Sequence, residues 1–154
     1  MDAVLLDTDV FSILMKGTDA RAALYKPHVK GKTIALSFVT VGELFAWSVK
    51  RGWGATKISD LERRIKTAVI VPYDLNLCRQ FGQIKAEMLK VGRTVPSNDL
   101  WIAACALRHS IPLVTHNAKD FAGIPGLKVI TEVEPPKPQK TAGLFPSQTP
   151  PDEK

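Results

Sequence analysis

Cysteine is scarce in this chain, and so are the other groups from which many known catalytic sites are built. The 154 residues include two cysteines, Cys78 and Cys105, with no C-x-x-C pair. Both fall in apolar helical patterns, which predicts buried, reduced thiols rather than a disulfide framework. The sequence also lacks G-x-S-x-G, G-x-G-x-x-G and Walker A motifs. Serine-hydrolase triads, dinucleotide binding and nucleoside triphosphate binding are therefore disfavoured.

Long apolar runs are missing as well. No run approaches the ~18 residues that a membrane-spanning helix needs, and the first seven residues carry acids rather than the basic start of a signal peptide. We therefore expect a cytoplasmic protein with no membrane partner. The net charge of +6 indicates an anionic partner, with nucleic acid the leading case, although a charge that serves only solubility remains open.

The chain is long enough for one domain and too short for two ordinary ones. Short apolar runs predict strands, and the segments between them have helical spacing, which together favour an α/β fold with a parallel sheet and right-handed crossovers. The expected strands are 3–6, 33–36, 68–71, 111–115 and 128–130, and the expected helices are 8–16, 19–25, 41–50, 59–67, 77–91 and 97–107.

A change in composition marks the end of this domain. Six of the chain's 11 prolines lie between Pro135 and Pro151, with few apolar residues among them. Such a stretch cannot bury enough surface to offset its ordering entropy. We expect a folded domain over residues 1–133 and a flexible, Pro-rich tail over residues 134–154.

Four acidic residues stand where an α/β sheet would gather them. Asp7 follows the first strand, Glu43 and Asp99 open helices, and Asp120 comes shortly after the strand that ends at Thr115. Open parallel sheets collect functional groups at the carboxyl ends of their strands, near the point where strand order reverses. The sequence therefore predicts one acidic crevice.

Each acid also has an ordinary structural explanation. Asp7 suits a helix N-cap, and Thr40-Val41-Gly42-Glu43 matches the spacing of a capping box. Asp99 could complement a helix dipole, and Asp120 could belong to an Asx turn in a loop. These alternatives explain helix starts, but not why four acids follow the strands of one sheet.

Converging carboxylates repel one another unless a cation neutralises them. Oxygen ligands without Cys or His at ligand spacing point to Mg²⁺, with Mn²⁺ possible, rather than to zinc. A metal held in this way commonly polarises a phosphate and activates water, so phosphodiester hydrolysis fits both the acids and the basic remainder. Thr8, Thr115 and Asn117 are expected to position water or substrate, with local turn bonding as the open alternative for each.

Four segments resemble the PIN-domain family, and within it the VapC-type toxin ribonucleases of toxin–antitoxin pairs. They span about Val4 to Ile130 and are similar in content and order to the family's motifs: Leu5-Leu6-Asp7-Thr8-Asp9-Val10, Thr40-Val41-Gly42-Glu43-Leu44, Asn98-Asp99-Leu100-Trp101-Ile102-Ala103-Ala104, and Thr115-His116-Asn117-Ala118-Lys119-Asp120-Phe121. The resemblance implies a three-layer α/β/α PIN-like fold with a central, mainly parallel sheet.

The same resemblance implies a function and roles for the acids. Asp7 and Asp99 are expected as the principal Mg²⁺ ligands, with Glu43 and Asp120 completing a catalytic set of four. Many members carry an Asp where Asn117 stands here, which leaves the division of work between Asn117 and Asp120 open. The implied protein is an endoribonuclease toxin that cleaves RNA, forms a homodimer and is silenced by a cognate antitoxin protein. A DNA or structure-specific nuclease, and a catalytically silent PIN-like RNA-binding module, are the alternatives.

Overall fold

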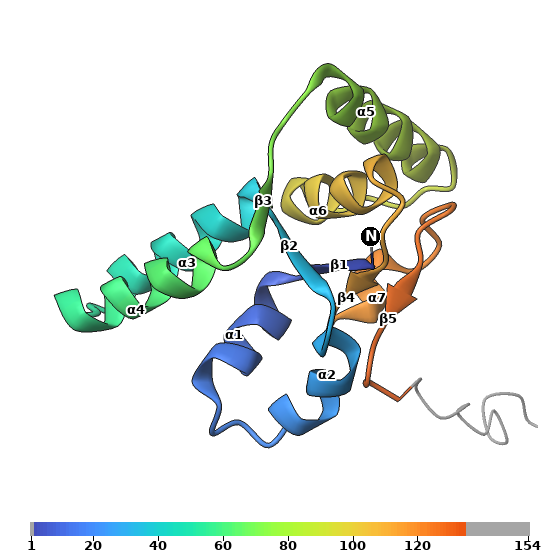
Figure 1. Cartoon of the computed structure of the whole chain (residues 1–154). Coiled ribbons are helices and arrows are strands. Elements are labelled where there is room, and N and C mark those ends of the chain that lie inside the picture. The colour runs from blue at the N-terminus through green and yellow to red at the C-terminus, as the bar shows by residue number, and fades with distance from the viewer. Residues whose placement is uncertain (1, 135–154) are drawn as a thin grey trace, which may run out of the picture.

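The computed structural model describes residues 2–134, which form one five-stranded sheet with helices on both faces (Figure 1). The strands are β1 (Ala3–Leu6), β2 (Thr33–Ser37), β3 (Val69–Val71), β4 (Leu113–Val114) and β5 (Val129–Ile130). All four pairings are parallel, in the order β3-β2-β1-β4-β5. Along the chain, β2 and β3 are added on one side of β1, and β4 and β5 are then added on its other side. Strand order therefore reverses at β1.

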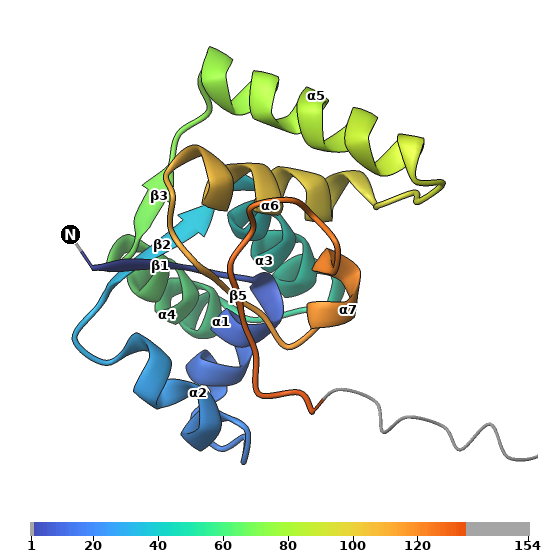
Figure 2. The same cartoon turned by 90° about the vertical axis from the view of Figure 1, so that its right-hand side faces the viewer.

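Seven helices of the described residues connect and cover these strands. They are α1 (Thr8–Lys16), α2 (Ala22–Val29), α3 (Phe38–Lys50), α4 (Ala55–Lys66), α5 (Leu75–Lys90), α6 (Ser97–Arg108) and α7 (Ala118–Phe121). Figures 1 and 2 show α5 and α6 over one face of the sheet and α1 and α2 over the other. The expected three-layer α/β/α fold with a parallel sheet is confirmed.

Two apolar clusters explain why β1 is a continuous apolar run. Leu5 points into the cluster shared with α5 and α6, whereas Val4 and Leu6 point into the cluster shared with α1, α2 and α4. Each of these three side chains is at most 2% exposed. A strand buried on both faces holds the residue that follows it, Asp7, in a fixed place at the carboxyl edge of the sheet.

Helix boundaries differ from the prediction in two informative places. Helix α2 runs through Pro27 to Val29, although the sequence predicted an end before the proline, and the N–H of Lys30 still bonds to the carbonyl of Lys26. Helix α3 begins at Phe38 rather than Val41, because the Ser37 hydroxyl accepts a hydrogen bond from the N–H of Val39 and caps the helix three residues earlier.

Three further expectations can be compared with the structure. Cys105 is buried in α6 as predicted, but Cys78 is exposed on α5, because α5 presents only one narrow face to α6 and Cys78 lies outside it. No helix among residues 2–134 is long and apolar enough to cross a bilayer. The flexible tail predicted over residues 134–154 lies, apart from Glu134, outside the described residues.

Candidate active site

One acidic cavity of about 270 Å³ opens at the carboxyl end of β1. It brings together six of the seven predicted site residues, and the seventh, Thr115, lies behind Asp7 and contacts it. Asp9, Trp47 and Asn98 also line it, although the sequence interpretation assigned none of them to the site. The complete lining is Asp7, Thr8, Asp9, Glu43, Trp47, Pro96, Asn98, Asp99, Asn117 and Asp120.

Asp7 is the most enclosed of these acids, with 6% of its surface exposed. Its Oδ1 accepts a 2.8 Å hydrogen bond from the N–H of Thr8, and its Oδ2 accepts a 2.7 Å bond from the Thr115 hydroxyl. Burial raises the pKa of Asp7, the two hydrogen bonds lower it, and the charge of Asp120 raises it further. Asp7 therefore caps α1, as one alternative held, and also faces other carboxylates.

Glu43 is not part of a capping box. Because α3 begins at Phe38, Thr40 lies inside the helix, where its hydroxyl accepts a 3.0 Å hydrogen bond from the hydroxyl of Thr8. Glu43 lies in the following turn, partly buried, and lines the cavity. Burial, followed by the charges of Asp7 and Asp99, raises its pKa.

Asp99 lies in the first turn of α6, where a helix dipole acting alone would favour the charged carboxylate. Its pKa is instead raised to about 6, by burial first and then by the charges of Asp7 and Asp120. The acidic neighbours thus outweigh the dipole. Asp120 belongs to α7 rather than to a loop, so the Asx-turn alternative is wrong.

Asp9 is a cavity residue that the sequence interpretation missed. Its Oδ1 accepts a 2.6 Å hydrogen bond from the N–H of Val10, and its Oδ2 accepts bonds from the N–H of His116 at 3.2 Å and from Asn117 Nδ2 at 2.9 Å. Burial and then the charge of Asp7 raise its pKa to about 7. The available signal was its spacing: an acid two residues after Asp7 remains at the same strand end.

The predicted positioning side chains each make a hydrogen bond inside the protein. Thr8 donates to Thr40, Thr115 to Asp7 and Asn117 to Asp9. Two of these three bonds hold carboxylates, so in this structure Thr115 and Asn117 orient acids. A role in positioning substrate or water remains a prediction for all three.

The donor set suits a hard divalent cation in its chemistry. Five carboxylates line one cavity, and four of them have raised pKa values, in each case partly because of a neighbouring negative charge: Asp7, Asp9, Glu43 and Asp99. A cation would remove this conflict. Among residues 2–134 no group of three or more His, Cys, Asp or Glu side chains is placed to hold an ion, so Mg²⁺ would be held here by one or two carboxylates together with water.

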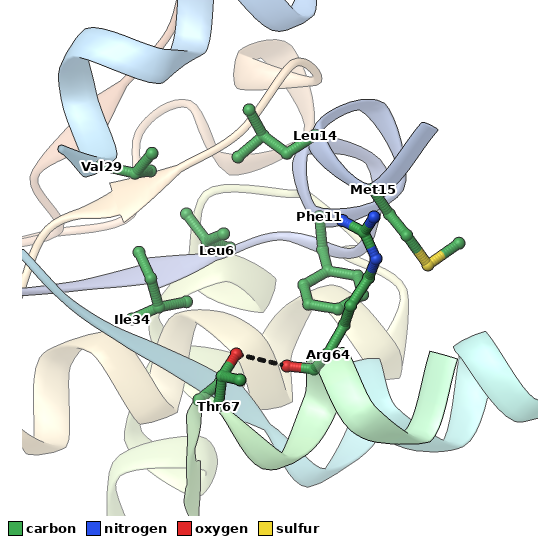
Figure 3. Close-up of a pocket in the computed structure, with 9 residues that line it drawn as sticks. Leu6, Phe11, Leu14, Met15, Val29, Ile34, Arg64 and Thr67 are labelled. Carbon is green, nitrogen blue, oxygen red and sulfur yellow. Dashed lines mark hydrogen bonds between the residues drawn. The ribbon is translucent and has the colours of Figure 1, made fainter. Parts of the chain in front are cut away.

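A second cavity, of about 170 Å³, differs sharply from the first (Figure 3). Apolar side chains of α1, α2, β1 and β2 face one another around it, and Arg64 of α4 lies at its side. The lining contains no carboxylate, thiol or imidazole: Leu6, Phe11, Leu14, Met15, Val29, Ile34, Arg64, Thr67 and Ala68. This cavity suits an apolar group and offers no hydrolytic chemistry, whereas the acidic cavity gathers five carboxylates and is therefore the candidate active site.

The parallel α/β/α fold and the acids gathered beside its central strand agree with the family that the chain matches. The family model for the PIN domain matches residues 4–127, and the chain belongs to the PIN-domain family. Within that family its relatives are VapC proteins. It is 31% identical to "Ribonuclease VapC5" of Mycobacterium tuberculosis, covering 80% of this chain and 89% of the relative. It is 30% identical to "Ribonuclease VapC1" of Haemophilus influenzae strain R2866, covering 80% and 93%.

Solved structures show the same relationship. The structure of VapBC2 from Rickettsia felis, bound to a DNA fragment from its promoter, superposes with a TM-score of 0.73 at 25% identity. The match covers 84% of this chain and 98% of the matched chain. The resemblance to the PIN family inferred from four short segments is therefore confirmed over residues 4–127.

Proposed function

We propose that this protein is a Mg²⁺-dependent endoribonuclease, the toxin of a toxin–antitoxin pair, which acts in the cytoplasm. The observation that carries the proposal is the acidic cavity, in which Asp7, at the junction of β1 and α1, meets carboxylates from α1, α3, α6 and α7. The names of its relatives, VapC ribonucleases, support the same activity.

Each acid is assigned a role according to its surroundings in the cavity. Asp7 and Asp99 would hold Mg²⁺, and the carboxylate of Asp7 is kept in place by hydrogen bonds from Thr115 and from the N–H of Thr8. When bound, Mg²⁺ acts as a Lewis acid that polarises the scissile phosphate and makes water more acidic. Glu43, whose pKa is raised, is suited to accept the proton that the attacking water releases. Asp120 also lines the cavity and completes the set.

Charge supports a polyanionic substrate. The chain has a net charge of +6 although the cavity concentrates five of its 15 acids, so the remaining surface is strongly basic. Such a surface attracts an RNA backbone, while the acidic cavity accepts a phosphate only with a cation present. Cleavage should therefore depend on the metal and weaken with rising salt.

The proposed protein partner is a cognate antitoxin. The superposed Rickettsia felis protein is part of a VapBC assembly, which supports a partner of this kind. We propose that the antitoxin silences the enzyme by placing a basic side chain among the carboxylates of the cavity. Such a side chain would relieve the same repulsion that a metal relieves.

The proposed oligomer is a homodimer. Exposed apolar side chains follow the outer strand β3 and the turn after it, and Phe38 joins them because Ser37 pairs with Val71. Edge strands with exposed apolar residues favour association with another chain. The exposed residues are Phe38, Val69, Ile70, Tyr73 and Leu75. Light scattering of Ile70→Lys against the unmodified protein tests this part of the proposal.

The decisive experiment compares RNA and DNA strands of the same sequence as substrates, with Mg²⁺ or with EDTA. The unmodified protein should cut internal RNA bonds only with Mg²⁺, and Asp99→Asn should not cut. Cleavage of DNA alone, or only of one folded structure, would favour the DNA or structure-specific nuclease. Binding of RNA without cleavage by a well-folded protein would favour the silent binding module. Sequencing of RNA ends after brief expression, with Asp7→Ala as the control, would then identify the cleaved RNA.

A further inference from the structure

The segment that carries Asp120 is too short to hold its own position. Helix α7 has four residues, and its N-cap residue, Asn117, makes no capping hydrogen bond with its side chain. A single helical turn does not recover the entropy of ordering it. Even so, Asp120 lines the cavity and contributes to the raised pKa values of Asp7 and Asp99. Its place is therefore fixed by contacts with the rest of the protein: Phe121 of α7 is buried in the core cluster shared with α6, and hydrogen bonds hold the two ends of the segment.

The start of this segment is held by Asp9. One carboxylate oxygen, Oδ2, accepts hydrogen bonds from the N–H of His116 and from Asn117 Nδ2, so it binds two consecutive residues of the turn before α7. The other oxygen accepts from the N–H of Val10, which fixes the carboxylate to α1. All three donors are N–H groups, and a carboxylate can accept from all of them whereas an amide has only one oxygen.

The end of the segment is held by Arg93, which lies in the connection between α5 and α6. Its Nη2 donates to the carbonyl of Lys119 at 2.9 Å and to that of Asp120 at 3.0 Å. Carbonyls in the last turn of a helix lack the partner that the next turn would supply, although that of Lys119 also accepts a 3.4 Å bond from the N–H of Ala122. The Arg93 backbone is itself anchored, because its N–H bonds to the carbonyl of Met88 at 2.9 Å. Figure 2 shows α7 close to the start of α6, next to this connection.

We propose that Asp9 and Arg93 are positioning residues that hold α7 from its two ends, so that Asp120 faces Asp7 and Asp99 across the cavity. This inference rests on the proposed nuclease function for its effect on cleavage. Its structural part, the fixation of α7, can be measured without any activity. Neither residue needs to touch the substrate in order to act, since both work through the placement of Asp120.

The first test is hydrogen–deuterium exchange of the segment 115–122 in metal-free protein. Asp9→Asn and Arg93→Ala should each speed exchange of this segment and leave the sheet strands protected. Arg93→Lys keeps the charge but offers a point donor in place of the planar fork, so it should give an intermediate result. Asp60→Asn is the matched control, since Asp60 is an α4 carboxylate bonded to Arg63 and Arg64 away from the cavity.

The second test separates kcat from KM for RNA cleavage. Both variants should lower kcat by about tenfold to a hundredfold, the size expected when a reacting group is displaced by about 1 Å, with little change in KM. In an Asp120→Asn background the same substitutions should add no further loss, because they act through Asp120. A full additional loss in that background would mean that Asp9 or Arg93 acts directly, and would overturn the proposal.

The two proposals can fail separately. If the unmodified protein cuts no RNA, the nuclease assignment fails, while faster exchange in Asp9→Asn and Arg93→Ala still supports the fixation of α7. If the unmodified protein cuts RNA and both variants match the Asp60→Asn control in exchange and in kcat, the positioning role is wrong and the nuclease stands.

Discussion

The hydroxyl of Thr115 donates a 2.7 Å hydrogen bond to Oδ2 of Asp7, a residue 108 positions earlier in the chain. The contact exists because β1 and β4 are neighbours, and the N–H of Asp7 also bonds to the carbonyl of Val114 at 2.9 Å. Thr115 is fully buried, so water cannot replace its hydroxyl at Asp7. Strand pairing thus fixes the orientation of the central acid of the cavity.

Replacement of Thr115 by Val removes this contact with little change in packing, because the two side chains have nearly the same shape. It also removes the acceptor of the 3.0 Å hydrogen bond from the N–H of Asn117. Oδ2 of Asp7 would lose its hydroxyl donor, at a cost of about 1–3 kcal/mol in the free energy of unfolding. The pKa of Asp7 should rise further, since this hydrogen bond lowers it. Urea denaturation measures the change in the free energy of unfolding, and RNA cleavage as a function of pH measures the effect on Asp7. The control is Thr67→Val, at an exposed threonine of the α4–β3 turn. Unchanged stability would contradict the role of the contact.

Asp99→Asn distinguishes an active-site acid from a structural one. Because burial and acidic neighbours raise the pKa of Asp99 to about 6, its ionised form is disfavoured by the fold at neutral pH. We expect cleavage to be abolished while the metal-free free energy of unfolding holds or rises by up to about 1 kcal/mol, a value reduced for partial exposure. A fall of about 1 kcal/mol with cleavage intact would instead identify Asp99 as a dipole partner of α6.

The origin of the α3 helix gives a purely structural prediction. Ser37→Ala removes the hydroxyl that accepts from the N–H of Val39, and should lower the free energy of unfolding by about 1 kcal/mol. Glu43→Gln should not lower stability, because Glu43 caps nothing and its carboxylate is disfavoured by its neighbours. Thermal melting of the two variants measures this contrast. If Glu43→Gln lowered the melting temperature and Ser37→Ala did not, the capping box suggested by the sequence would be correct.

Much of the fold follows from local pattern, and the departures have identifiable causes. The runs at β1 and β2 are apolar because both faces of the sheet are covered, so their positions could be predicted. Helix α2 passes through Pro27, where the sequence predicted an end, but it continues for only two residues beyond the proline and closes with the bond from the N–H of Lys30 to the carbonyl of Lys26. Helix α7 was missed because four residues carry too little periodicity to detect.

The site was predictable as a set of acids following strands, but not in its internal contacts. The sequence places Asp7 and Asp120 at one sheet edge, since parallel strands align their carboxyl ends. It does not indicate that Asp9 reaches across to Asn117, because that bond depends on the path of the turn after β4. The contacts of Arg93 could not be predicted either, because its partners are backbone carbonyls, which every residue type carries.

The pH dependence of stability should reveal the acidic cavity directly. The pKa values of Asp9 and Asp99 are raised from 3.8 to about 7 and about 6, so the folded state keeps protons that the unfolded chain has already released. Between about pH 4 and about pH 7 the native state therefore binds more protons, and the free energy of unfolding should fall as the pH rises.

Carboxylates outside the cavity change the free energy of unfolding over a different pH range. Exposed acids with lowered pKa values, such as Asp19 and Asp60, change the stability only below about pH 4, where the unfolded chain takes up protons first. Under the proposed function, Mg²⁺ would bind the ionised carboxylates, so its addition should raise the melting temperature strongly at about pH 8 and little at about pH 5. Urea denaturation across this range, with EDTA or Mg²⁺, measures both curves. Asp99→Asn should flatten the dependence of the free energy of unfolding on pH in EDTA and reduce the stabilisation by Mg²⁺. A free energy of unfolding that rises with pH in EDTA, between about pH 4 and about pH 7, would contradict the convergence of carboxylate charges at this cavity.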